Sequence, residues 1–341
     1  DDKKGLWGTC LFDRVVRLPK SGPSLSQNGE GPRWLEANGF SIVSLANNHM
    51  MDYGEGAMEY TKSRFRSSHT FGAGSWSEAY SPCIIDKNGE KVAIFGLAHY
   101  EFGLLADKWD SRYQKGIAWI NHPDVDRIIL QYRKEVDYLI IFAHAGVEHI
   151  EQPLPEWRDR YRSLIDLGCD AVIASHPHIS QGWEIYKDKP IVYSLGNFYF
   201  PKPIEKPKQW YKSLCASLDL QGGKVLLSIT PVVFDENEIS IDNSKETEAN
   251  IARINADLSV KSRYMKYINT LCLEKLANYD KSFERSGYIK FGRWMKVLKY
   301  SMKFLLGKDN NFSSVFLENN FRCESHRWCV TRGIKLRDNY Q

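Results

Sequence analysis

The pattern of apolar and polar positions is clearest in the middle of the chain. Residues 137–143 are almost entirely apolar and end at His144, and residues 170–174 are apolar and lead into Ser-His-Pro-His. Short apolar runs of this kind are typical of strands that are buried on both faces. Between them, residues 155–167 carry aromatic and aliphatic side chains at helical spacing, and Gly168 follows as a helix stop. The pattern predicts a strand, a helix and a second strand in succession.

The same periodicities continue on both sides of this unit. The apolar residues 40–46 predict a strand that breaks into Asn47-Asn48-His49. Further strands are expected at 82–86, 91–98, 182–186, 191–195, 214–220 and 225–234, and further helices at 34–38, 55–67 and 122–135. We therefore expect one α/β domain over residues 1–235. After an acidic linker, a mainly helical extension is expected over residues 236–341.

Histidines gather where these strands are expected to end. A strand-helix-strand crossover makes the two strands parallel and places both carboxyl ends at one edge of the sheet. His144, His176 and His178 should therefore lie together, and the strand that precedes Asn48 and His49 should add these two side chains. A single histidine is more often a structural residue than a ligand. The prediction of a functional site rests on the convergence of several.

The side chains at these strand ends suit a metal ion. Imidazole nitrogens bind Zn, Fe, Mn or Ni, and an asparagine amide adds a neutral oxygen donor. We therefore expect a divalent metal site that includes Asn48, His144, His176 and His178, with Mn, Fe or Zn as one or two ions. His99 also ends an expected strand and could line the same pocket.

Four segments carry a resemblance to a known family. They are SLANNHMMDYG at 44–54, FAHAGVE at 142–148, SHPH at 175–178 and YSLGNF at 193–198. In this order they resemble the motifs of the bacterial capsule-synthesis family, the CapA-type or poly-γ-glutamate capsule proteins, a branch of the calcineurin-like metallophosphoesterases. The resemblance covers about residues 34–234. It implies a four-layer α/β/β/α sandwich with a dinuclear metal site at the strand ends.

The resemblance also implies roles for individual residues. Asn48, His144 and His176 would bind one metal, and His178 would help to bind the other. His49 would be the catalytic acid or transition-state stabiliser that faces the leaving group. Glu148 matches the glutamate of the family's His-x-Gly-x-Glu motif, and would either orient His144 or act as a catalytic acid/base group.

One part of the family pattern is not found in the sequence. Family members begin with a strand that ends in Gly-Asp and continue with an Asn-Leu-Glu segment, and together these resemble the carboxylate half of the metal site. The nearest carboxylates here are Asp13 and Asp52. Two hypotheses follow. The chain is a metal-dependent hydrolase-like enzyme of capsule or surface-polymer synthesis that cleaves phosphoesters, or it is a degenerate, non-catalytic member that binds a polyanion or a partner protein.

The net charge and the cysteines indicate which kinds of partner and which cellular compartment to expect. The formal net charge of +4 over 341 residues is too small, and too evenly spread, to indicate a nucleic-acid-binding protein. The seven cysteines are odd in number and scattered, which favours a reducing compartment. No export signal or membrane helix is visible, so the chain as it stands is expected in the cytoplasm. A missing N-terminal segment would change that expectation to a membrane-associated or extracellular protein.

Two features of the C-terminal extension remain open. Residues 288–308 contain no acidic residue, and on a helix their lysines lie opposite an apolar face. Such a helix either packs on the domain or contacts an anionic membrane surface or a partner. Cys323-x-x-His326-x-x-Cys329 presents three soft metal ligands without a fourth nearby, which is a weak indication of zinc.

Overall fold

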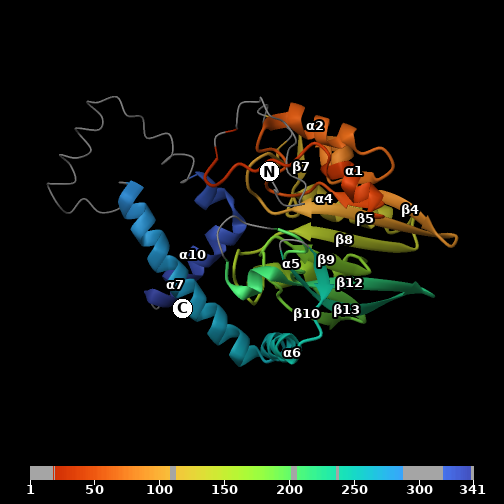
Figure 1. Cartoon of the computed structure of the whole chain (residues 1–341). Coiled ribbons are helices and arrows are strands. Elements are labelled where there is room, and N and C mark those ends of the chain that lie inside the picture. The colour runs from red at the N-terminus through yellow and green to blue at the C-terminus, as the bar shows by residue number, and fades with distance from the viewer. Residues whose placement is uncertain are drawn as a thin grey trace, which may run out of the picture.

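A six-stranded sheet forms the centre of the protein (Figure 1). The computed structural model describes residues 18, 20–107, 113–200, 206–235, 238–286 and 318–338. In order across the sheet, the strands are β10 (Trp183–Tyr186), β11 (Lys189–Val192), β9 (Ala171–Ser175), β8 (Tyr138–His144), β5 (Glu90–Ala98) and β4 (Cys83–Lys87). The four inner strands are parallel and the two edge strands are antiparallel to them.

The register of the parallel strands brings their carboxyl ends to one edge. Ala98 of β5 is opposite His144 of β8, and His144 is opposite Ser175 of β9. The crossover between β8 and β9 is α5 (Pro155–Asp166), which has proline in its first turn and stops before Gly168. This is the strand-helix-strand unit that the sequence predicts.

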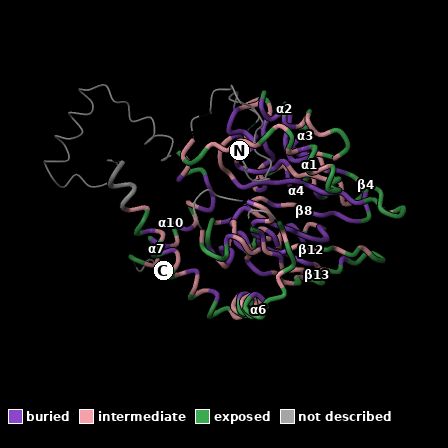
Figure 2. The backbone as a smooth tube through the Cα atoms, viewed as in Figure 1, coloured by how far each residue is buried: buried purple, intermediate pink, exposed green. Residues whose placement is uncertain are grey.

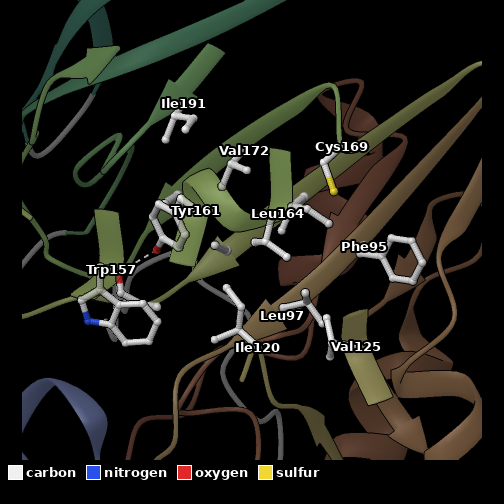
Figure 3. Close-up of a cluster of buried hydrophobic side chains, with 14 of the residues drawn as sticks. Phe95, Leu97, Ile120, Val125, Trp157, Tyr161, Leu164, Cys169, Val172 and Ile191 are labelled. Carbon is white, nitrogen blue, oxygen red and sulfur yellow. Dashed lines mark hydrogen bonds between the residues drawn. The ribbon is translucent and has the colours of Figure 1, made fainter. Parts of the chain in front are cut away.

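Helices cover one face of the sheet. The largest core cluster lies between α4 (Pro123–Tyr132), α5 and alternate residues of the inner strands. Figure 3 shows part of this cluster, with Tyr161 and Leu164 of α5 beside Val172 of β9. In Figure 2 the tube of β8 is buried along most of its length, as the continuous apolar run predicts.

A second layer of strands packs on the opposite face. A separate cluster joins Ile94 and Ile140 of the central sheet to Phe71, Val225 and Ile42. The last three residues belong to β2 (His69–Phe71), β13 (Lys224–Phe234) and β1 (Ile42–Ser44), respectively. Strand β13 lies in an antiparallel sheet between β12 (Lys212–Gln221) and β14 (Ile239–Ile241).

Strand β1 also contacts a second helical layer. Val43, the next residue along β1, points the other way and packs in a cluster with Met58 of α2 (Gly54–Arg64). Helix α1 (Gly31–Ala37) packs beside α2. Because successive side chains of a strand face opposite sides, β1 lies between the central sheet and these helices. The predicted α/β/β/α order is confirmed.

Short elements at the ends of the strands were not predicted. They are β3 (Ala73–Ser75), α3 (Trp76–Ala79), β6 (Leu104–Leu105), β7 (Lys115–Ala118) and the 3-10 turn Lys208–Tyr211. All five are two to four residues long, too short to show a periodicity in the sequence.

The C-terminal helices are α6 (Lys245–Ser259), α7 (Lys261–Ser286) and α10 (Glu324–Arg337). The segment predicted as an acidic linker instead forms β14 and the first turn of α6, which Ser244 caps. Leu258, Ile268 and Cys329 pack into the same core cluster as α5, while the domain division at residue 235 stays a prediction. Residues 288–308 and Asp13 lie outside the described residues. None of the described helices combines the length and apolar character that a membrane crossing requires.

Candidate metal centre

Three of the predicted ligands meet at the carboxyl edge of the central sheet. His144 ends β8, His176 follows β9, and Asn48 follows β1. Nε2 of His144 lies 3.1 Å from Oδ1 of Asn48 and 3.3 Å from Nδ1 of His176. The structure thus brings together the three side chains that the resemblance assigns to one metal.

Neighbouring groups orient these ligands. The amide nitrogen of Asn48 donates to Oε2 of Glu101 at 2.7 Å, which turns its oxygen toward His144. The hydroxyl of Ser175 lies 3.2 Å from Nδ1 of His144, so that Nε2 is the nitrogen that faces the centre. Such outer contacts fix both the tautomer and the direction of a metal ligand.

Burial keeps the two central imidazoles neutral. It lowers the pKa of His144 and of His176 well below 6.5, and the nearby histidines lower both further. A neutral imidazole has one N–H group and one lone pair. Nε2 of His144 faces both an amide oxygen and a second imidazole nitrogen, and a single N–H cannot serve both. A divalent cation would satisfy all three donor atoms, so the residues present fit a metal ion.

The Ser-His-Pro-His turn has an uncommon backbone conformation. His176 has φ of 101° and His178 has φ of 65°, both in the left-handed region. The turn packs against the loop after β8, where a Cβ on Gly146 would come within 2.8 Å of Pro177. Backbone strain of this kind is concentrated at functional sites, because only the surrounding structure can maintain it.

His178 lies apart from the three clustered ligands. Its ring is 6.1 Å from that of His176, between centroids, and its Nδ1 is 2.8 Å from Oδ1 of Asn197. The ring of Trp210 stacks on it at 4.8 Å. The implied role of His178 at a second metal stays a prediction.

His49 is oriented by a buried carboxylate. Its Nδ1 lies 2.8 Å from Oδ2 of Asp52, which also accepts from the amide of Leu25 at 2.7 Å. The other oxygen of Asp52 accepts from Lys20 at 2.5 Å. Both oxygens of Asp52 are therefore engaged by donors, one of which is the ring of His49.

Glu148 does not contact His144. Its carboxylate oxygens lie 3.8 Å from Nε2 of His178 and 3.8 Å from Nε2 of His149, and the side chain is half exposed. Ser175 occupies the position behind His144 that Glu148 would take in the first of its two possible roles. Of the two roles considered for Glu148, the geometry favours the acid/base group over the orientation of His144.

Sequence reasoning missed Glu101 and undervalued His99. His99, Glu101 and His176 each offer a ligand atom within 4.8 Å of the other two. Nε2 of His99 is buried without a hydrogen-bond partner and lies 3.6 Å from Oε1 of Glu101. Burial lowers the pKa of His99 from 6.5 to about 4, although the negative charges of Glu324 and Glu148 act to raise it. His99 directly follows β5, next to β8 in the sheet, and Glu101 lies two residues further along, so the strand-end rule that selected His99 could also have found Glu101.

Two cavities meet at this centre. A small one of about 40 Å³ is lined by Asn48, His49, His144, His176 and His178, among others. A larger one of about 360 Å³ is mostly apolar, and it reaches His144 from between β1 and β8. All the predicted site residues except Glu148 therefore border the small cavity.

Comparisons with known proteins agree with the motifs. The model of the family "Bacterial capsule synthesis protein PGA_cap" matches residues 13–202. The chain is 29% identical over 224 residues to the capsule biosynthesis protein CapA of Bacillus anthracis, covering 62% of this chain and 52% of that protein. It is 31% identical over 180 residues to the PGA biosynthesis protein CapA of Bacillus subtilis, covering 52% and 47%.

A more distant relative has a similar description. The chain is 25% identical over 167 residues to a probable polyglutamine synthesis accessory protein of Mycobacterium tuberculosis, covering 46% of this chain and 44% of that protein. The chain spans about half the length of the curated relatives it matches. Because the family model covers more than half of its residues, the chain belongs to the bacterial capsule synthesis family.

Proposed function

We propose that this protein is a metal-dependent hydrolase-like enzyme of capsule or surface-polymer synthesis, with phosphoester hydrolysis as its reaction. The proposal rests on the three side chains that meet at the sheet edge. Nε2 of His144 lies 3.1 Å from Oδ1 of Asn48 and 3.3 Å from Nδ1 of His176. The printed names of the relatives support the link to capsule and poly-glutamate synthesis. In this proposal His178 contributes to a second metal position.

The protein's own groups have distinct tasks in this reaction. A bound divalent cation would supply a more acidic water and an electrophile for a phosphoryl oxygen. His49 is held by Asp52 through Nδ1, which leaves Nε2 to donate a proton to the leaving group. The proposal assigns Glu148 as a second acid/base group, because one of its carboxylate oxygens lies 3.8 Å from Nε2 of His178.

The metal content of the purified protein tests the proposal. We expect protein prepared without chelator to carry Mn, Fe or Zn and to hydrolyse bis(p-nitrophenyl) phosphate. His176→Ala should lose metal and activity together. His69→Ala is the matched control, because His69 is exposed on β2, and it should retain both.

Two results would contradict the proposal. Full metal content in His176→Ala would refute the ligand assignment. Wild-type protein without bound metal, and without activity on added Mn or Zn, would refute the enzyme and favour the alternative of a module that binds a polyanion or a partner.

A further inference from the structure

The first turn of α10 is held directly against the candidate metal centre. The hydroxyl of Ser325 donates to the carbonyl of Gly146 at 2.6 Å and lies 3.2 Å from Nδ1 of His99. The carboxylate of Glu324 is 1% exposed and accepts from the amide of Tyr100 at 2.6 Å. In Figure 1, α10 crosses α7, and the two helices pack together. These contacts fix the start of the last described helix at the edge where the histidines meet.

The start of α10 also carries two side chains that can bind a metal ion. Cys323 and His326 are three positions apart, so they share one side of the helix start. A ligand atom of each lies within 4.8 Å of the other and of a carboxylate oxygen of Glu101. Glu101 also groups with His99 and His176 within the same limit. Its carboxylate therefore stands between the histidine centre and α10.

The third member of the Cys-x-x-His-x-x-Cys pattern points elsewhere. Sγ of Cys329 lies 3.6 Å from Sγ of Cys272 on α7, inside the main core cluster. The zinc ligand set suggested by the sequence is therefore altered in the structure. Glu101, from a distant part of the chain, takes the place expected for Cys329.

We infer that Glu101, Cys323 and His326 form an additional metal site, selective for zinc, which is adjacent to the histidine centre and distinct from both metal positions proposed there. A thiolate, an imidazole and a carboxylate are all zinc ligands, and three protein ligands leave a fourth position open. Glu101 would be a ligand of this site, whereas in the metal centre proposed above it orients Asn48, so the two sites are adjacent but have different ligands.

Cys323 offers its sulfur to an ion that would be held away from solvent. The thiol is fully buried, and its Sγ lies within 4.8 Å of a carboxylate oxygen of Glu101. Zinc would bind the sulfur as thiolate and release its proton to solvent. On His326, Nδ1 contacts the hydroxyl of Tyr279, so that Nε2 is the nitrogen for the metal.

Cobalt substitution tests this site without any measurement of activity. The full chain is stripped of metal and titrated with Co(II), whose thiolate complexes absorb in the near ultraviolet by sulfur-to-metal charge transfer. We expect this band in the wild type and its loss in Cys323→Ser. Cys329→Ser is the matched control on the same helix, and it should keep the band. His326→Ala, a second variant, should bind about one zinc fewer per chain than the wild type.

The outcomes separate this site from the histidine centre. A band that persists in Cys323→Ser, or no band in the wild type, would overturn the inference. Unchanged zinc content in His326→Ala would do the same. His176→Ala should keep the sulfur band while it loses the other metal. If His176→Ala loses no metal but Cys323→Ser loses the band, the proposed function fails and this site stands.

Discussion

Replacing Asp52 with asparagine should destabilise the protein without removing its metal. The carboxylate of Asp52 is 1% exposed and receives three donors, which are Lys20 at 2.5 Å, His49 at 2.8 Å and the amide of Leu25 at 2.7 Å. An asparagine has only one acceptor oxygen, so at least one of these donors would face the amide NH₂ group.

The size of the effect follows from the burial of the ion pair. The side chain of Lys20 is 4% exposed, so Asp52→Asn leaves an ammonium group without its counter-charge inside the protein. Breaking a buried pair by removing one partner costs about 3–5 kcal/mol, because the remaining charge is desolvated and uncompensated. We expect a loss of this size in the free energy of unfolding at neutral pH.

Urea unfolding followed by tryptophan fluorescence measures this loss, and a double-mutant cycle with Lys20→Met identifies its cause. If the uncompensated charge is responsible, the double variant should be more stable than the sum of the two single losses predicts. Strict additivity, or a loss below about 1 kcal/mol for Asp52→Asn, would refute the reasoning. Loss of bound metal in a folded Asp52→Asn variant would show that Asp52 is a ligand and not a positioning residue.

Three further predictions concern the site and the scaffold. His49→Ala should keep its metal and lower turnover of a phosphodiester by about 10²–10⁴-fold; unchanged turnover would remove His49 from the mechanism. Burial alone would raise the pKa of Glu184, but hydrogen bonds from two arginines and a tyrosine lower it from 4.5 to about 2. The ionised Glu184 therefore stabilises the protein above about pH 4.5, and this stabilisation is lost as the pH falls toward 2. Glu184→Gln should be less stable than the wild type at pH 7, and the difference between their urea unfolding midpoints should narrow below pH 4. Gly146→Ala should lower the thermal midpoint, because φ is 140° and the added Cβ would lie 2.8 Å from Pro177; an unchanged midpoint would show that the turn can adjust.

The regular part of the fold was predictable because its patterns are local. The helix expected at 155–167 is found at Pro155–Asp166, and the strand expected at 137–143 is found at Tyr138–His144. The parallel crossover then determines that His144 and His176 share an edge. Nothing beyond periodicity and chain topology is needed for these elements.

The rest of the site depends on contacts between distant segments. Ser325 and Cys323 reach the sheet edge only because α7 and α10 pack into the main core cluster. No local periodicity indicates that packing. Glu101 belongs to a short loop after β5, where the strand-end rule could have found it, but its contact with the amide of Asn48 depends on the fold. Asp52 was considered as a ligand from its position near His49, whereas the structure uses it to orient that ring.

Anomalous X-ray diffraction from crystals grown with Mn or Zn would test the central claim most directly. The account predicts a peak between Asn48, His144 and His176, at about 2.0–2.1 Å from the imidazole nitrogens in the zinc crystals. Density that shows these side chains hydrogen-bonded to one another, with no anomalous peak among them, would contradict it.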